Sequence, residues 1–363
     1  MNLHSGFSIP PLEGSEKMSA TKKFYAHSLP GEAPEKWQGL EEHLKDVASR
    51  AESSAAIFNS ASWANTAGIL HDIGKAHCDF QRYLLQENGL DASEHDDQRT
   101  GSRVNHSGAG AVFACEKWNS PRIIGKTLAY LIAGHHAGLP DWHGGRDSLS
   151  YRLENEKPVA EAVRGYAAEF LASLPAKLMP PVSFKPEFYH FWVRMLYSCL
   201  VDADFLDTES FMDAARNDQR PEFPSLKELK KRFDQRLKEK VSKVAPTFLN
   251  QVRADILEAC RIAAQQSSGL FSLTVPTGGG KTLSGTAFAI DHAIRHGKSR
   301  VIYVIPFTSI IEQTADVLRK FFDSDNVVEH HSNIAPDKEM ESPQLTLAAE
   351  NWDAPVIVTT SVQ

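Results

Sequence analysis

An adjacent histidine and aspartate, His71 and Asp72, form the clearest chemical motif in the sequence. They stand in the run GILHDIGK, residues 68–75, at the end of an apolar segment with helical spacing. Side by side they offer one nitrogen and one oxygen ligand, which suits a hard or borderline divalent cation. A His-Asp dipeptide is common by chance, but the flanking glycines and Lys75 make this context far more specific.

Further histidines and carboxylates occur at the ends of other apolar helical segments. The candidates are His43 in EEHLKDVA, His106 in NHSGAGA, the tandem His135 and His136 in AGHHAGLPD, and Asp202 or Asp204 in LVDADFLD. A metal site inside a helical bundle needs ligands of this kind from separate helices. Any single histidine is better explained as a core or capping residue, and we interpret the remaining ones, including His27 and His77, in that way. The ordered set favours metal binding.

A glycine-rich turn near the C-terminus predicts a nucleotide phosphate-binding loop. The expected strand FSLTVP, residues 271–276, comes before it and an expected helix follows it. Backbone N–H groups of such a loop surround the phosphates, Lys281 would reach the β- and γ-phosphates, and Thr282 would bind Mg. Val275 replaces the first glycine of the strict G-x-x-x-x-G-K pattern. The predicted nucleotide-binding residues are Pro276, Thr277, Gly278, Gly279, Gly280, Lys281 and Thr282.

The elements that must position these residues fall into two classes. From about residue 34 to residue 211 apolar residues recur at helical spacing, which predicts an all-α domain. Residues 217–244 combine an apolar stripe with many lysines and arginines, which predicts a basic amphipathic helix. From residue 250, short apolar runs such as VIYVIP and PVIVTT alternate with helical segments, which predicts a parallel sheet.

Composition limits the class of protein. The 363 residues carry a net charge of −7 with 42% hydrophobic residues, so nucleic acid would have to be bound by local basic patches. No apolar run is long enough to span a bilayer, and the N-terminus lacks the pattern of a secretion signal. Cys78, Cys115, Cys199 and Cys260 are scattered and form no CxxC pair. We therefore expect a cytoplasmic protein that does not bind membranes.

The His-Asp motif and its neighbours resemble a known family. HDIGK with flanking histidines is similar to the HD phosphohydrolase superfamily. The fuller set AHS, WQGLEEHL, GILHDIGKAHCDFQRYL, NHSGAGA, AGHHAGLPD and LVDADFLDTE resembles the CRISPR-associated type I helicase-nuclease, and most closely its subtype I-C form. The likeness covers the chain from about Lys23.

The resemblance implies a ligand set and an activity. The implied metal ligands are His43, His71, Asp72, His106, His135, His136 and Asp204, because the family motif of Asp, aromatic residue and Leu fits Asp204 better than Asp202. Asp72 and Lys75 are the implied catalytic residues, with Lys75 near substrate phosphate. The implied activity is cutting of single-stranded DNA by water that one or two divalent ions (Mn, Ni, Co, Fe or Mg) would activate. The nitrogen-rich ligand set favours the transition metals among these ions.

The same resemblance extends to the C-terminal third. PTGGGKT is similar to the phosphate loop of superfamily 2 helicases, IPFTSIIEQ to their motif Ia and VTTSVQ to their motif Ib. It implies DNA contacts from Pro306, Phe307, Thr308, Thr359 and Thr360, and binding of ATP and Mg in the complete protein. The sequence ends at Gln363, before a Walker B strand or a second lobe. We therefore expect this chain not to unwind DNA or to act as an ATPase.

The predicted organisation has four parts. They are a polar leader at 1–22, an HD nuclease domain at 23–215, a basic helical linker at 216–248, and an incomplete first RecA-like helicase lobe at 249–363. The leading hypothesis is a monomeric single-strand DNA nuclease of CRISPR interference, recruited by a Cascade-type effector complex. Two alternatives stay open: an HD phosphohydrolase that acts on nucleotides, and a non-catalytic fragment that binds DNA or Cascade.

Overall fold

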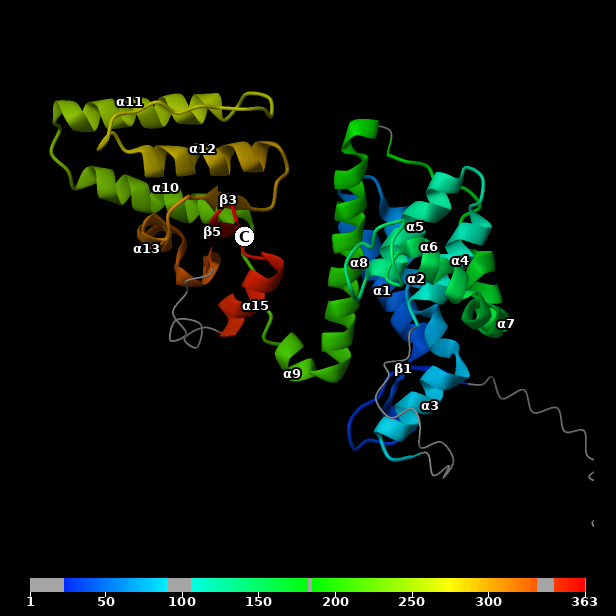
Figure 1. The fold of residues 1–363 in the computed structure, drawn as a ribbon. Coiled ribbons are helices and arrows are strands. Elements are labelled where there is room, and N and C mark those ends of the chain that lie inside the picture. Colours follow the sequence, from blue (N-terminus) through cyan, green and yellow to red (C-terminus); the bar gives the residue numbers. More distant parts are fainter. Residues whose placement is uncertain (1–22, 91–105, 182–184, 332–342, 363) are drawn as a thin grey trace, which may run out of the picture. The chain divides into compact units, whose positions relative to one another are not determined.

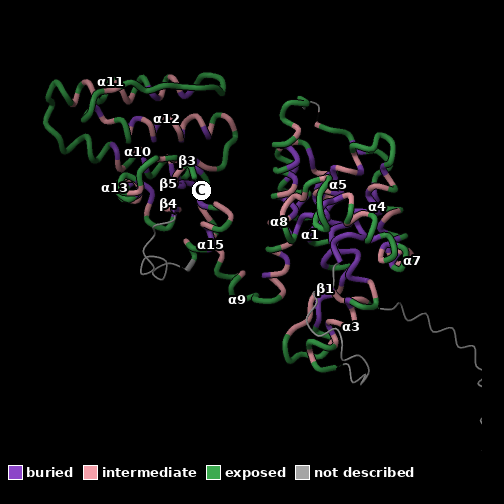
Figure 2. The backbone as a smooth tube through the Cα atoms, viewed as in Figure 1, coloured by how far each residue is buried: buried purple, intermediate pink, exposed green. Residues whose placement is uncertain are grey.

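The computed structural model describes residues 23–90, 106–181, 185–331 and 343–362, so the predicted leader lies outside the described residues. The chain divides between residues 212 and 213 into two compact units (Figure 1). Each unit has its own buried core, and Figure 2 shows the buried positions concentrated on the inward faces of the helices. None of the helices in the described part of the chain is long and apolar enough to cross a membrane.

The first unit is a helical bundle, as the periodicity predicts. Its helices are α1 (Leu40–Ala56), α2 (Ala61–Leu70), α3 (Cys78–Glu87), α4 (Gly108–Lys117), α5 (Arg122–Gly134), α6 (Leu149–Asn155), α7 (Lys157–Ser173) and α8 (Tyr189–Met212), with short 3-10 turns η1 (Pro34–Lys36), η2 (Ile73–Ala76) and η3 (Pro186–Phe188). The all-α expectation misses one feature. Strands β1 (Tyr25–His27) and β2 (Gln38–Gly39) pair antiparallel beside the bundle. They are too short to show an alternating pattern in the sequence.

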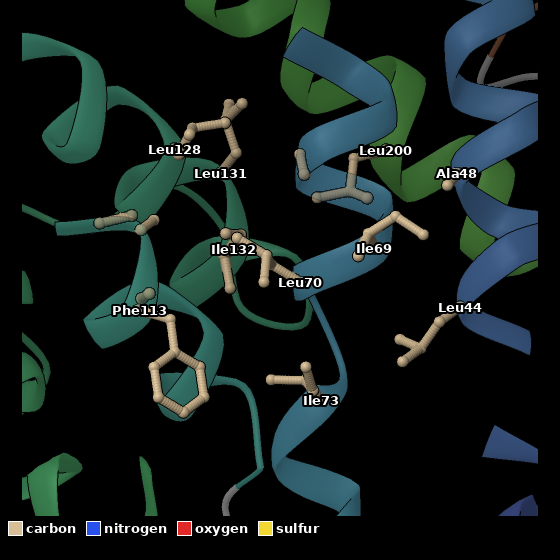
Figure 3. Packing of buried hydrophobic residues seen from close by; sticks show 14 of the residues in the cluster. Leu44, Ala48, Ile69, Leu70, Ile73, Phe113, Leu128, Leu131, Ile132 and Leu200 are labelled. Carbon is tan, nitrogen blue, oxygen red and sulfur yellow. The ribbon is translucent and has the colours of Figure 1, made fainter. Parts of the chain in front are cut away.

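The core of this unit forms around α2. Helix α1 buries a stripe at three- and four-residue spacing that runs from Leu40 to Ala55, whereas α2 is buried over most of its surface. Gly68 lets the two helices approach closely, because a Cβ there would lie 2.5 Å from the Cα of Ala48. Figure 3 shows Leu70 at the end of α2 beside Ile132 of α5, in the same cluster. Apolar burial of this extent is the main stabilising term of the bundle.

Helix α2 stops at the His-Asp pair, and a tight turn follows. The turn packs directly against the chain segment that begins α4. A Cβ on Gly74 would lie 2.1 Å from the carbonyl oxygen of His106, and one on Gly110 would lie 1.8 Å from that of Leu70. Only glycine permits both approaches, so these two positions bring His71, Asp72 and His106 together.

The second unit is an α/β domain with a parallel sheet. Its elements are α9 (Ala214–Asn217), α10 (Leu226–Ser242), α11 (Phe248–Ala263), α12 (Lys281–Arg295), β3 (Val301–Val304), α13 (Thr308–Phe322), η4 (Ser324–Asn326), β4 (Val327–His330), α15 (Pro343–Asn351) and β5 (Val356–Thr359). The strand order is β3–β5–β4, and both pairings are parallel. This confirms the predicted fold class.

Two expectations for this unit need correction. The segment 271–276 is not a strand, and Leu270 and Leu273 beside and within it are exposed. Its β-rich composition has no pairing partner among the described strands, and a strand needs one to bury its backbone groups. Residues 216–248 are also more than a linker. Leu229 and Phe233 of α10 lie in the core of the second unit, where Phe233 stacks on Phe322 with ring centroids 5.5 Å apart.

Candidate metal centre

The seven predicted ligands lie together inside the first unit, although they come from five separate helical regions. His43 lies on α1, His71 and Asp72 at the end of α2, His106 just before α4, His135 and His136 at the end of α5, and Asp204 on α8. Their donor atoms form two groups that share Asp72. One group contains His43, His71, Asp72 and Asp204, and the other contains Asp72, His106, His135 and His136.

Each oxygen of Asp72 faces one of these groups. Its Oδ2 lies 3.5 Å from Nε2 of His43 and 3.4 Å from Nε2 of His71. Its Oδ1 lies 3.4 Å from Nε2 of His106 and 3.3 Å from Nε2 of His135. Neighbouring ligands on one transition-metal ion, with bonds of about 2.1 Å, lie about 3.0–3.4 Å apart. The spacing therefore suits one ion on each side of the carboxylate.

Asp204 closes the first group, while Asp202 is not part of it. Oδ1 of Asp204 lies 3.5 Å from Nε2 of both His43 and His71. In the second group, Nε2 of His106 lies 2.8 Å from Nε2 of His136. Of the two aspartates considered from the sequence, the geometry favours Asp204.

Three of the histidines have their Nδ1 atom held by an oxygen acceptor. His71 donates from Nδ1 to the carbonyl of Gly68 at 2.7 Å, and His135 donates to the carbonyl of Ile132 at 2.6 Å. His43 donates from Nδ1 to Oδ2 of Asp207 at 2.7 Å. Because each Nδ1 carries a hydrogen, Nε2 is the atom left to bind a cation in every case.

Charge at the centre is concentrated on Asp72 and its neighbours. Burial alone would raise the pKa of Asp72, but Lys75, His71 and His106 outweigh it and hold that pKa well below its usual range. Burial opposes ionisation of His71, but the carboxylates of Asp72 and Asp204 raise the pKa of His71 to about 10. A divalent cation bound here would supply the positive charge that these two carboxylates favour.

The residues fit a divalent metal ion by a second criterion. Nε2 of His43, His71 and His135 and Oδ1 of Asp72 are buried and have no hydrogen-bond partner among the described residues. A buried polar atom without a partner costs about 1–3 kcal/mol. Four such atoms converging on two small volumes are best explained by cations that they would bind.

The predicted phosphate-binding residues form a turn at the start of α12 that is mostly exposed, although Gly279 within it is buried. Gly278 and Gly280 have φ of 86° and 85°, a conformation that favours glycine, and Lys281 and Thr282 are exposed in the first turn of the helix. Arg253 of α11 donates to the carbonyl of Gly278 through Nε at 2.9 Å and Nη2 at 2.7 Å. The loop and helix of the prediction are present without the preceding strand.

The predicted DNA contacts differ among themselves. Pro306 and Phe307 are exposed after β3, and Thr308 and Thr360 are partly exposed. Thr359 is fully buried and donates from Oγ1 to the carbonyl of His330 at 2.7 Å. The side chain of Thr359 therefore holds the sheet together and is not available to DNA here, which corrects that prediction.

Two parts of the chain match known families. Residues 28–192 match the family described as Cas3, HD domain, and residues 250–363 match the family described as DEAD/DEAH box helicase. The first match lies within the helical unit, which we call the HD domain after it, and the second lies within the α/β unit. Neither family description names a subtype.

Solved structures of T. fusca Cas3 are similar in fold. The crystal structures of that protein alone, with ATP and with ADP share 15%, 17% and 18% identity with this chain, with TM-scores of 0.53, 0.53 and 0.52. Each alignment covers 93% of this chain and 43% of that chain, so this chain spans less than half the length of those relatives. No protein with a curated description matches the sequence.

Lys75 of the HD domain is buried beside the centre. Its Nζ lies 2.7 Å from Oδ2 of Asp72 and donates to Nε2 of His27 at 3.1 Å. Burial, together with the charge of Lys75, lowers the pKa of His27 to about 3. His27 is therefore a neutral acceptor for the lysine, a role that the sequence interpretation did not give it.

Sequence reasoning also missed Gln38 and Asp207. Both are buried, and Nε2 of Gln38 donates to Oδ2 of Asp207 at 2.8 Å. One cue was available, because Asp207 lies three residues after Asp204 and so shares its helix face. His77 keeps its predicted capping role, since its Nδ1 accepts the backbone N–H of Asp79 at 3.3 Å.

A cavity of about 720 Å³ opens beside the second ligand group of the HD domain. Its lining includes His106 and His136 on one side and most of the loop of residues 137–148, together with Arg152. His143 and Arg146 are exposed on that loop. The ligands are therefore reachable from outside on this side of the domain.

Proposed function

We propose that the chain is a metal-dependent nuclease of CRISPR interference that cuts single-stranded DNA in its HD domain. The observation that carries the proposal is the placing of Asp72 between two ligand groups, one at each of its oxygens. A shared carboxylate between two nitrogen-rich groups is the arrangement expected of a two-metal phosphodiesterase site. Of the candidate cations Mn, Ni, Co, Fe and Mg, the histidine ligands favour the transition metals.

The ligands assign roles on both sides of Asp72. His43, His71 and Asp204 would hold one ion, and His106, His135 and His136 the other, with Asp72 shared. Bound divalent cations lower the pKa of water and neutralise charge on the phosphodiester.

The protein side chains supply position and access. Lys75 holds Oδ2 of Asp72 at 2.7 Å and fixes that carboxylate between the two groups. The cavity beside His106 and His136 has room for a nucleotide, and Arg146 at its edge carries the charge that a DNA backbone requires. A strand entering there would meet the second ligand group first.

The second unit supports a linked but separate activity. The turn at Gly278–Thr282 and the helix that follows suit binding of ATP with Mg. Exposed Pro306 and Phe307 suit contact with single-stranded DNA. We further propose a monomer that acts in the cytoplasm on a strand presented by a Cascade-type effector complex.

Circular single-stranded DNA gives a direct test. Metal-stripped protein is incubated with the circle, each cation is added separately, and ATP is left out. We expect cutting with at least one transition metal, and its loss in Asp72→Ala. Linear product identifies endonuclease activity, because an exonuclease has no end to attack.

A matched pair tests the role of the late aspartates. Asp204→Asn removes a carboxylate that lies 3.5 Å from two histidines. We expect cutting to fall about 100-fold, since losing even a partner behind a ligand costs about 10- to 100-fold. Asp202→Asn, on the same helix, leaves both ligand groups intact and is expected to cut at the parent rate. The proposal would be refuted if the folded protein failed to cut DNA with every cation tested, or if the two variants lost cutting activity equally.

A further inference from the structure

A continuous chain of hydrogen bonds links Lys75 to His43 behind the metal ligands. Lys75 donates to Nε2 of His27 at 3.1 Å, and Nδ1 of His27 lies 2.7 Å from Oε1 of Gln38. Nε2 of Gln38 lies 2.8 Å from Oδ2 of Asp207, and Nδ1 of His43 lies 2.7 Å from the same oxygen. The chain begins and ends at groups that touch Asp72 or its ligand group.

The chemistry of these groups fixes the direction of every bond. The Asp207 carboxylate only accepts, so Gln38 must present its N–H₂ group to it and His43 its Nδ1–H. The carbonyl oxygen of Gln38 is then left for His27, whose Nδ1 must carry the hydrogen. Nε2 of His27 is therefore an acceptor, and the Lys75 ammonium, which has only donors, satisfies it. No step of the chain can be reversed on its own.

The backbone around the chain is held as firmly as the side chains. His27 and Gln38 are register partners in the β1–β2 pair. The amide of Gln81 bonds Tyr25 at both its N–H (3.0 Å) and its carbonyl (2.9 Å), and also donates to the carbonyl of Lys75 at 2.7 Å. One side chain thus ties strand β1 to the turn that carries Lys75.

We propose that His27, Gln38 and Asp207 are positioning residues that together aim Nε2 of His43 at the metal centre and hold Lys75 on Asp72. The proposal rests on the proposed function only in taking the two ligand groups as metal sites. In this proposal the role of the short β1–β2 pair is to place His27 opposite Gln38. It also explains why these buried and half-buried polar groups are joined by hydrogen bonds, since leaving them partly unpaired would be costly.

Two substitutions at His27 each break the chain of hydrogen bonds on a different side of this residue. Asparagine places its amide where Nδ1 of the imidazole lies, so His27→Asn keeps a donor for Gln38 and loses the acceptor for Lys75. Glutamine reaches the position of Nε2, so His27→Gln keeps the acceptor for Lys75 and loses the donor for Gln38. A purely structural role would not distinguish these two variants in metal binding.

The test is calorimetric titration of the metal-stripped full chain with Mn²⁺, with the visible spectrum of the Co²⁺ form as a second readout. Asp207→Asn is expected to weaken one binding step 10- to 100-fold, the range for loss of a carboxylate behind a ligating histidine. The other step, at the group with His106 and His135, is expected to be unchanged. His27→Gln should weaken the same step as Asp207→Asn, whereas His27→Asn should weaken that step less, because it keeps the donor for Gln38 and loses only the acceptor for Lys75.

A double variant and a control complete the design. If His27 and Asp207 act through one chain, His27→Gln with Asp207→Asn weakens that step no more than Asp207→Asn alone. His190→Asn, an exposed histidine on α8, is the control, and circular dichroism checks folding. Equal weakening of both steps, additive effects, or identical behaviour of the two His27 variants would overturn the inference. Because metal binding is measured without DNA, a chain that binds metal as expected but cuts no DNA refutes only the proposed function.

Discussion

Gly110→Ala should damage both the stability and the metal centre of the HD domain. The added Cβ would lie 1.8 Å from the carbonyl oxygen of Leu70 and 3.3 Å from Cγ2 of Ile132, where ordinary contact begins at 3.4 Å. The atom in the way belongs to the backbone of α2, one residue before His71. It cannot turn aside as the end of a flexible side chain would, so α4 and the end of α2 must separate by about 1.6 Å.

Two effects of opposite sign determine how much Gly110→Ala lowers the free energy of unfolding. Alanine inside a helix is better than glycine by about 0.5–1 kcal/mol. Overpacking a dense core costs about 1–3 kcal/mol, and a clash with backbone belongs at the upper end. We therefore expect a net loss of about 2 kcal/mol in the free energy of unfolding. Because a misplacement of about 1 Å can cost 100-fold in rate, metal-dependent cutting should fall by a similar factor.

Gly165→Ala is the matched control. Gly165 lies on the exposed face of α7, and a Cβ there would meet nothing within 4 Å. The same substitution should therefore stabilise the domain by about 0.5–1 kcal/mol. Urea unfolding followed by tryptophan fluorescence measures both variants, with the metal stoichiometry taken on the same samples. If Gly110→Ala is as stable as the parent and keeps its metal, close packing of α4 on α2 does not position His71.

Three further predictions concern the core, the metal and the pH range. Phe233→Ala should destabilise the second unit by about 3–5 kcal/mol in denaturant titrations, because the Phe233 ring is buried against Phe322. A loss of stability below about 1 kcal/mol would show that α10 is only a linker. Mn²⁺ at 100 times its Kd should stabilise the HD domain by about 2.7 kcal/mol in thermal scans, and an equal gain in Asp72→Asn would contradict the assigned site. Burial raises the pKa of Tyr303 to about 12 from its usual value of about 10, so its contribution to stability is present below pH 10 and is lost as the pH rises through 12. Tyr303→Phe should flatten the fall of the urea midpoint over that range, and an unchanged slope would refute the assignment.

The sequence marks His71, Asp72, His135 and His136 as candidate ligands because these residues stand where helical runs end. GILHDIGK and AGHHAGLPD each combine an apolar helical run with a break, and the ordered motifs bring the remaining residues into the same family pattern. The second unit is predicted less completely. FSLTVP has the composition of a strand, but composition is only a preference, and a strand also needs a neighbour with which to pair. Likewise, the apolar stripe of α10 is visible in the sequence, but the sequence does not show that this stripe packs against α13.

The differences among the three oriented histidines explain which part of the site could be read from the sequence. His71 and His135 cap the C-termini of α2 and α5, where the last carbonyls have no partner within the helix. Each ring donates to the carbonyl three residues earlier, so its orientation is encoded locally. His43 lies within α1, where the nearby carbonyls are already used in the helix, so its Nδ1 must find an acceptor elsewhere. That acceptor is Asp207, 164 residues away in the sequence, and its own geometry depends on Gln38 and His27. No local pattern can encode such a link, which is why the positioning residues became visible only in the folded chain.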